Sequence, residues 1–153
     1  MILYHGSNMP IETVDLSKSR PFKDFGRAFY LSEDKKQALE MARFKTLTTG
    51  GVETLTSFNV DDLSGLNCLR FDAYTEEWAE FVYNNRDEHQ QFQHPFDVVY
   101  GPIANDTVGV QIRDLRERKI SFKSFLENLK YHKGITFQYA FCTELAVSKL
   151  TII

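Results

Sequence analysis

Apolar residues along this chain fall into short runs that polar and glycine-containing segments separate. Met1–Tyr4, followed by Gly6–Asn8, predicts a strand that enters a turn, and Arg27–Leu31 predicts a second strand. Residues 13–24 between them are polar and show little periodicity, so we expect a long surface loop there. Loops of this length in small domains often carry function.

The first helix is predicted directly after the second strand. Ser32 followed by Glu33 and Asp34 is typical of a helix start, because the hydroxyl caps free amides and acidic side chains favour the positive end of the helix dipole. We expect this helix to run to about Phe44, before a turn at Thr48–Gly51. Its predicted apolar stripe consists of Ala38, Leu39, Met41 and Ala42.

Two further helices are predicted in the second half of the chain. Thr75 and the two glutamates after it open one, and Ser121 precedes the other, for which Gly134 supplies a left-handed stop. The residues that share one face at the i, i+3, i+4 spacing are Trp78, Phe81 and Val82 in the first of these helices and Phe122, Phe125, Leu126 and Leu129 in the second.

The remaining apolar segments predict strands around 52–60, 66–71, 96–100 and 135–141. In the last of them apolar residues alternate with small or polar ones, which predicts one apolar face and one small, polar face. The apolar positions are Ile135, Phe137, Tyr139 and Phe141, and the opposite ones are Thr136, Gln138, Ala140 and Cys142. Strands outnumber helices and are not strictly interleaved with them, so we predict an α+β fold with a largely antiparallel sheet.

Composition is typical of a globular protein with one domain. The 153 residues suit a single domain, 1–153, and a chain with 42% hydrophobic and 25% charged residues is not globally disordered. The longest uninterrupted apolar runs are four residues, far short of the ~20 that span a bilayer, so we expect no membrane segment and no leader. Cys68 and Cys142 are too few for a disulfide scaffold, and a reducing cytoplasm fits best.

Charge and known motifs exclude several functions. With 18 basic and 21 acidic residues the net charge is −3, so no whole-chain positive field holds a nucleic-acid backbone. Arg113–Lys119 mixes both signs, which predicts a solvated helical face. The four histidines lack metal-ligand spacing, and the phosphate-loop, dinucleotide-binding and nucleophile-elbow motifs are absent, so we expect no metal site.

Three short motifs stand out by their residues and order. YHGS at Tyr4–Ser7 ends the first strand, DFGRAFYLS at Asp24–Ser32 contains the second, and FQYAF at Phe137–Phe141 is the last. Together they resemble the ADP-ribosyltransferase superfamily, in its diphtheria-toxin and poly(ADP-ribose) polymerase branch. The chain is most similar to a small bacterial domain family of unknown function, which shares the opening YHGS, the KDFG-x-x-FYL block, a segment like GPIAND at Gly101–Asp106 and a closing Q-x-x-F-x-T. The resemblance covers nearly the whole chain and implies split antiparallel β-sheets with flanking helices and a central NAD cleft.

The resemblance implies roles for residues around the first two strands. His5 would hold a ribose hydroxyl of NAD, the Gly6 backbone would bond the nicotinamide carboxamide, and Ser7 would assist. Tyr30 would stack on the nicotinamide, since an aromatic face suits a ring that is cationic in the bound substrate. Met41 stands where the superfamily usually has a second aromatic, and methionine packs on a ring without a cation–π contact. Taken singly, His5 and Tyr30 also suit ordinary strand-end and core positions.

The third catalytic position that the resemblance implies is a glutamate at the start of the last strand, where this chain has Gln138. Glutamine can bond the ribose through its amide, but it has no charge to stabilise a developing cation and cannot act as a base. Slow or restricted chemistry would follow. Glu144 is the alternative acidic group, although Thr143 and Glu144 are typical of a helix start, which favours Gln138.

Two further residues are candidates for binding the dinucleotide. The loop 17–27 concentrates positive charge, and Arg20 is the first choice for the pyrophosphate of NAD, because a guanidinium offers bidentate donors. An ordinary solvated loop is the alternative. Asp106 closes the GPIAND segment and either faces the cleft, where it would position an acceptor or the adenosine ribose, or belongs to a structural turn.

The resemblance implies an NAD-dependent ADP-ribosyltransferase without a metal, in which His5, Tyr30 and either Gln138 or Glu144 are catalytic. The acceptor is a protein, a nucleic acid or a small molecule, and with water as acceptor the enzyme would be an NAD hydrolase. By analogy with bacterial relatives the protein is the toxin of a toxin–antitoxin pair, with an antitoxin protein as partner. The alternative, which Met41 and Gln138 favour, is a degenerate module that binds NAD, ADP-ribose or a partner protein without catalysis.

Overall fold

A computed structural model describes residues 1–129 and 134–153, and only the backbone at position 106. Short strands and helices follow one another much as the sequence patterns predict, while β7 and most of α3 were not expected. In chain order the elements are β1 (Ile2–Ser7), η1 (Leu16–Lys18), β2 (Phe29–Leu31), α1 (Lys35–Thr49), β3 (Thr54–Val60), β4 (Cys68–Arg70), α2 (Glu76–Arg86), β5 (Val98–Pro102), α3 (Asp106–Arg116), α4 (Phe122–Leu129), β6 (Phe137–Phe141), α5 (Glu144–Val147) and β7 (Leu150–Ile152).

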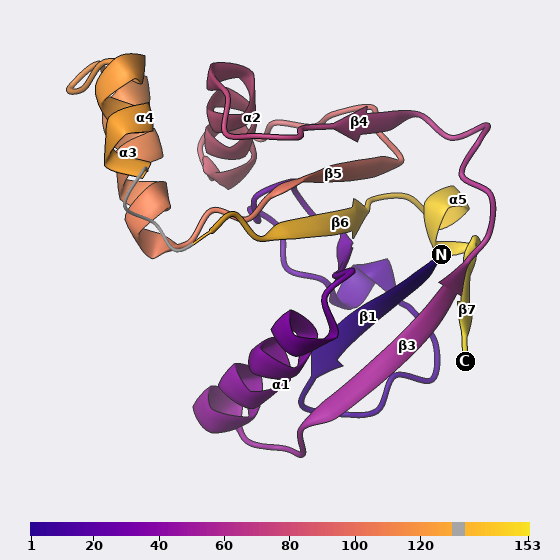
Figure 1. Cartoon of the computed structure of the whole chain (residues 1–153). Helices are drawn as coiled ribbons and strands as arrows, with labels where there is room; N and C mark the ends of the chain where they lie inside the picture. Colours follow the sequence, from indigo (N-terminus) through magenta and orange to yellow (C-terminus); the bar gives the residue numbers. More distant parts are fainter. Residues whose placement is uncertain (130–133) are drawn as a thin grey trace.

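The strands form two sheets, and Figure 1 shows α1 beside the first and α2 to α4 at one end of the second. The first sheet is antiparallel, with the strand order β1-β3-β7. The second has the order β2-β6-β5-β4, in which the β4–β5 pair is parallel and the other pairs are antiparallel. The prediction of an α+β fold with mainly antiparallel sheets and flanking helices is confirmed.

Strand β6 lies between two hydrophobic clusters. On one face Tyr139 and Phe141 pack into a cluster with Leu3, and on the other the fully buried Ala140 packs into a cluster with Trp78. The face predicted to carry small and polar residues is part of the core at Ala140. Side chains from α2, α3 and α4 belong to the same cluster, so a small residue there makes room for a helical layer.

Helix α1 begins two residues later than predicted. Asp34 is the N-cap, and its carboxylate accepts a hydrogen bond from the Lys36 amide at 2.9 Å. The Ser32 hydroxyl instead accepts from the Asp34 amide, also at 2.9 Å, and so shapes the turn before the helix. The helix continues to Thr49, beyond the predicted end.

The apolar stripe predicted for α1 is only half correct. Ala38 and Ala42 are buried where the helix crosses β1 at Gly6, but Leu39 is 42% and Met41 46% exposed. Small residues are needed on the inner face, because the helix backbone approaches the strand too closely for longer side chains. The larger apolar side chains are left on the surface.

Helix α2 carries the predicted apolar face into the core. Thr75 is its N-cap, Trp78 and Val82 are fully buried, and the Trp78 indole donates a hydrogen bond to the Pro102 carbonyl at 3.1 Å. Helix α3 starts at an Asn105 cap, which the GPIAND segment supplies. Within the described ranges, no helix is both long and apolar enough to cross a membrane.

Candidate functional site

The first two sequence motifs meet where the two sheets touch. Tyr4 and Ser32 form an isolated antiparallel bridge, in which the Tyr4 amide donates to the Ser32 carbonyl at 2.8 Å and the Ser32 amide donates to the Tyr4 carbonyl at 2.9 Å. Continued by two residues, this register sets Gly6 opposite Tyr30. Along its whole length β1 pairs with β3 on its other edge, and β2 pairs with β6. Gly6 and Tyr30 each lie two residues from this bridge, on either side of the boundary between the two sheets.

The amide and carbonyl of Gly6 point toward the boundary between the two sheets. The amide and the carbonyl of Tyr4 are hydrogen-bonded to Ser32, on the side away from β3. Residues two apart in a strand point their amide and carbonyl groups to the same side, so the amide and carbonyl of Gly6 also point away from β3. The Gly6 carbonyl accepts a hydrogen bond from Lys45 Nζ at 3.1 Å. A Cβ at this position would lie 1.8 Å from the Ala38 carbonyl oxygen, so the approach of α1 also requires glycine.

His5 lies beside Gly6 and is neutral at pH 7. Its Nδ1 is 2.8 Å from the Tyr30 carbonyl oxygen, and because a carbonyl can only accept, Nδ1 carries the proton and Nε2 keeps its lone pair. The ring stacks on Phe29, with centroids 4.3 Å apart. Burial, together with the positive charge of Lys45, lowers the pKa of His5 from 6.5 to about 4. The imidazole can therefore accept a hydrogen bond from a ligand hydroxyl.

The Tyr30 hydroxyl fastens the loop that precedes β2. It donates to the Gly26 carbonyl at 2.7 Å and accepts from the Phe25 amide at 3.0 Å. Burial raises the pKa of Tyr30 well above its usual range, so the hydroxyl keeps its proton. Tyr30 pairs with Ala140 in β6, and by the two-residue period of a strand its ring lies on the same sheet face as Gln138.

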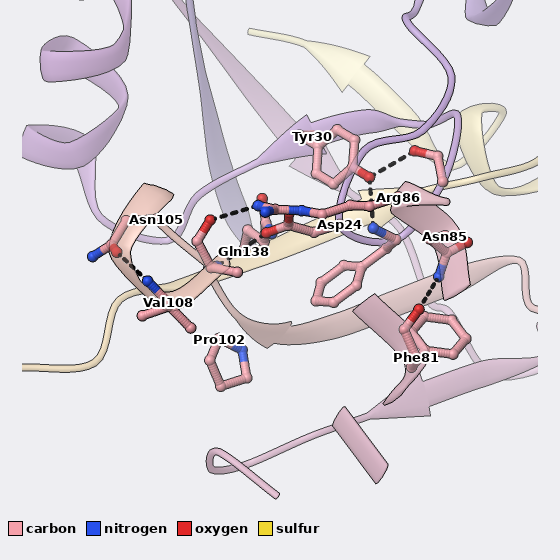
Figure 2. Close-up of polar contacts among 12 residues, drawn as sticks. Asp24, Tyr30, Phe81, Asn85, Arg86, Pro102, Asn105, Val108 and Gln138 are labelled. Carbon is pink, nitrogen blue, oxygen red and sulfur yellow. Dashed lines mark hydrogen bonds and ion pairs between the residues drawn. The ribbon is translucent and has the colours of Figure 1, made fainter. Parts of the chain in front are cut away.

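Gln138 belongs to a polar network centred on the buried Asp24, which Figure 2 shows. One carboxylate oxygen of Asp24 accepts from Arg86 Nε at 2.8 Å, and the same guanidinium donates to the Ala104 carbonyl at 2.8 Å. The other oxygen accepts from the Ala104 amide at 3.0 Å and from Gln138 Nε2 at 3.3 Å. The network joins the loop before β2, the end of α2, the β5–α3 connection and the start of β6.

This network decides what Gln138 can offer to a ligand. Its amide nitrogen donates to Asp24, so the carbonyl oxygen is the group that it can direct to a hydroxyl. The Asp24 carboxylate is itself paired with Arg86, whose Nη2 lies 2.5 Å from it. The sequence patterns assigned neither Asp24 nor Arg86 to the site, because they are 62 positions apart and no local periodicity connects them.

Glu144, the alternative to Gln138, lies in a different element. Strand β6 ends at Phe141, and Thr143 caps helix α5, with its Oγ1 accepting from the Ala146 amide at 3.1 Å. Glu144 would share a strand face with Gln138 only if the strand continued to it, and the strand does not. The helix start predicted at this point is confirmed, and the Glu144 side chain is exposed on it.

Lys45 is the positive side chain shown beside the Gly6 peptide. Lys45 is partly buried, and after burial the charges of Lys23 and Arg20 are the causes that lower its pKa. Arg20 itself is exposed in the loop before β2. Arg27, in the same loop, donates to two carbonyls of the loop's own backbone and so shapes it. Lys45 was not predicted as a site residue, because helical periodicity does not show which exposed lysine faces a strand edge.

The other predicted site residues are spread around this region. Ser7 is buried, and its hydroxyl accepts from the Met9 amide at 3.3 Å, which closes the turn after β1. Met41 lies on the exposed side of α1. The prediction for Asp106 concerns a side chain outside the described part of the structure.

Two concavities occur away from these residues. One of about 320 Å³ is lined by side chains of α2, α3 and the start of α4, and the other, of about 360 Å³, lies beside β3 and β7. His5, Tyr30 and Gln138 line neither of them, so the central NAD cleft remains a prediction. In residues 1–129 and 134–153, no three or more His, Cys, Asp or Glu side chains are grouped in a way that could hold a metal ion.

Comparison with known proteins gives one positive result. No curated protein and no solved structure matches the chain. A family model described as "Protein of unknown function (DUF3990)" matches residues 1–152, a range that includes both sheets and every residue of the candidate site. The chain therefore belongs to the DUF3990 family, whose function is unknown.

Proposed function

We propose that this protein is an ADP-ribosyltransferase that cleaves NAD. The observation that supports this most is the arrangement around Gly6, whose amide and carbonyl face away from β3 and toward Tyr30, with the neutral imidazole of His5 alongside. A carboxamide can donate one hydrogen bond to the Gly6 carbonyl and accept one from the Gly6 amide. An aromatic ring can stack on Tyr30, and a ribose hydroxyl can donate to His5 Nε2. A nicotinamide nucleoside presents all three of these groups.

In the proposed reaction, the bond between ribose C1′ and the nicotinamide nitrogen breaks, and nicotinamide leaves with the bonding electron pair. An oxygen or nitrogen of the acceptor forms the new bond to C1′ and gives up its proton. Positive charge moves from the pyridinium ring to the ribose in the transition state, where a nearby oxygen stabilises it. The group proposed for this is the Gln138 carbonyl oxygen, which the bond from its amide nitrogen to Asp24 leaves available.

Gln138 also favours a second candidate function, a module that binds NAD or ADP-ribose without cleaving it. An amide oxygen carries only a partial charge, and the adjacent Asp24 carboxylate is paired with Arg86. Within the enzyme proposal, water in place of another acceptor makes the protein an NAD hydrolase. The enzyme, whether transferase or hydrolase, releases nicotinamide from NAD, and the binding module does not.

The biological setting follows from the proposed chemistry and is proposed with it. Transfer of ADP-ribose to a cellular acceptor suits a toxin that an antitoxin protein neutralises, and the acceptor is a protein, a nucleic acid or a small molecule. The cytoplasm is the proposed compartment, since the free thiols of Cys68 and Cys142 stay reduced there.

Nicotinamide release from NAD tests this proposal. We expect release by the wild-type protein, stimulated by a lysate that supplies acceptor, and loss of release in His5→Ala and Tyr30→Ala, because each removes a group that holds the nicotinamide riboside. His89→Ala, which changes an exposed histidine, is the matched control and should keep the wild-type rate. No release under any condition, with NAD still raising the melting temperature, would reject the enzyme and favour the binding module.

A further inference from the structure

The concavity of about 320 Å³ at the helical end of the molecule has an apolar floor. It lies between α2 on one side and α3 with the start of α4 on the other, at the end of the second sheet where Figure 1 shows these helices. Ala79 and Ile112 line it and are buried in the core. Partly buried side chains that pack against the same cluster complete the floor: Leu115, Ile120 and Phe122. Apolar side chains at the bottom of a surface hollow favour a bound group that removes them from water.

Charged side chains of opposite sign stand on the two sides of this concavity. On the α2 side, Glu76 and Glu80 lie one helical turn apart. On the other side, Arg116 is the last residue of α3, and Arg118 follows it. All four side chains are exposed, and within the described residues none of them takes part in an ion pair. Each side is therefore available to a ligand group of the opposite charge.

The two arginines reach the concavity in different ways. The Arg116 guanidinium carbon lies 5.5 Å from the centre of the ring of Tyr83, a residue of α2 that also lines the concavity. Arg118 has a φ of 61°, in the left-handed region that glycine usually occupies after a helix. Its amide donates to the Leu115 carbonyl at 3.1 Å, a bond that glycine would make equally well. The backbone therefore does not explain the arginine, whose side chain lines the concavity.

The walls of the concavity restrict what can bind there. The peptide groups of α2 and α3 are hydrogen-bonded within each helix, so an extended segment would find no strand edge to pair with. A second copy related by two-fold symmetry would set one hollow against another and fill neither. The charged groups are exposed at the sides, whereas a small-molecule site holds a few polar groups inside the pocket. A helix bonds its own peptide groups and fills the groove between two other helices with side chains, so a helix is the occupant that fits.

We propose that the concavity between α2 and α3 binds an amphipathic helix of a partner protein, whose apolar stripe enters the concavity between one row of basic and one row of acidic residues. The basic row faces Glu76 and Glu80, and the acidic row faces Arg116 and Arg118. Burial of the apolar stripe supplies most of the binding free energy, and the two charged rows supply specificity. The residues proposed to bind NAD do not line this surface, so the inference does not depend on the proposed function.

A library of helical peptides displayed on phage supplies the probe. The central stripe of each peptide varies among apolar residues, and the positions on either side of the stripe vary among lysine, glutamate and glutamine. The wild-type protein should select peptides that carry lysine on one side of the stripe and glutamate on the other. Enrichment of peptides without this division of charge would contradict the proposed surface.

Equilibrium binding of a selected peptide at low ionic strength then locates the contact. Glu80→Lys should weaken binding about tenfold, because it replaces an attraction with a repulsion. Glu77→Lys reverses an exposed charge on the same helix that does not line the concavity, so it should resemble the wild type. A peptide in which glutamate replaces the basic row should bind Glu80→Lys more tightly than the wild type. A substitution that merely loosened α2 would weaken both peptides.

Arg118→Gly separates binding from stability. Glycine suits the left-handed backbone at this position, so the urea midpoint should rise, while loss of the guanidinium should weaken peptide binding about fivefold. Equal peptide affinity in wild type, Glu80→Lys and Arg118→Gly would overturn the inference. A wild-type dimer in sedimentation analysis that Glu80→Lys dissociates would also overturn it, because the surface would then belong to a second copy of the chain.

Discussion

The partly buried, neutral imidazole of His5 predicts a specific loss of stability in mild acid. Its pKa is lowered from 6.5 to about 4, so between these values the unfolded chain binds a proton that the folded protein does not. The stabilising contribution is complete above about pH 6.5 and is lost as the pH falls toward 4. A shift of this size corresponds to about 3 kcal/mol in the free energy of unfolding.

His5→Asn isolates this contribution, because an asparagine amide nitrogen can replace Nδ1 as donor to the Tyr30 carbonyl and does not titrate. Urea unfolding from pH 7 to pH 4 should show the wild type losing about 3 kcal/mol more than His5→Asn. His94, whose pKa is also lowered by burial, is present in both proteins, so its effect cancels in the difference. Parallel stability curves for the two proteins would refute the assignment of a buried, neutral His5.

Three further substitutions test the contacts around the site by urea unfolding. Gly6→Ala places a Cβ 1.8 Å from a carbonyl of α1 and should destabilise by about 3 kcal/mol, and an unchanged midpoint would contradict the close approach of helix and strand. Tyr30→Phe removes two hydrogen bonds to the preceding loop and should lower stability by about 2 kcal/mol and speed proteolysis there, whereas unaltered cleavage would argue against the anchor. Asp24→Asn leaves the Arg86 charge without its partner and should lower the free energy of unfolding by about 3 kcal/mol. Adding Arg86→Met to the same chain should restore part of this loss. Strictly additive losses from the two substitutions would contradict the pairing.

Local sequence patterns predicted most elements and missed how they pack. Thr75 and Thr143 begin helices as expected, because a cap depends on residues within one turn. What covers the face of β6 that contains Ala140 could not be predicted, since small residues suit either solvent or a closely packed helical layer, and only the tertiary fold decides between them. Met41 is exposed for a related reason: alanines occupy the inner face where α1 approaches β1.

The contacts of the candidate site follow from the sequence where they lie within one strand, and not where they join distant parts of the chain. His5 and Gly6 follow each other on β1, and His5 Nδ1 lies 2.8 Å from the Tyr30 carbonyl oxygen, so one motif supplies two of the candidate groups. The pairing of Asp24 with Arg86 joins a loop to a helix end and has no local signal. The bond from Lys45 to Gly6 spans 39 positions and depends on how α1 crosses the strand.

The central place of β6 also has a consequence for synthesis of the chain. This strand is the shared neighbour of β2 and β5, and β7 closes the other sheet against β3. Both strands come from residues after 136, so a nascent chain without them has neither sheet complete. Until β6 and β7 have been synthesised, β2 and β5 expose unpaired edges and long-range pairing is delayed. Removal of β6 and β7 should therefore prevent the domain from folding.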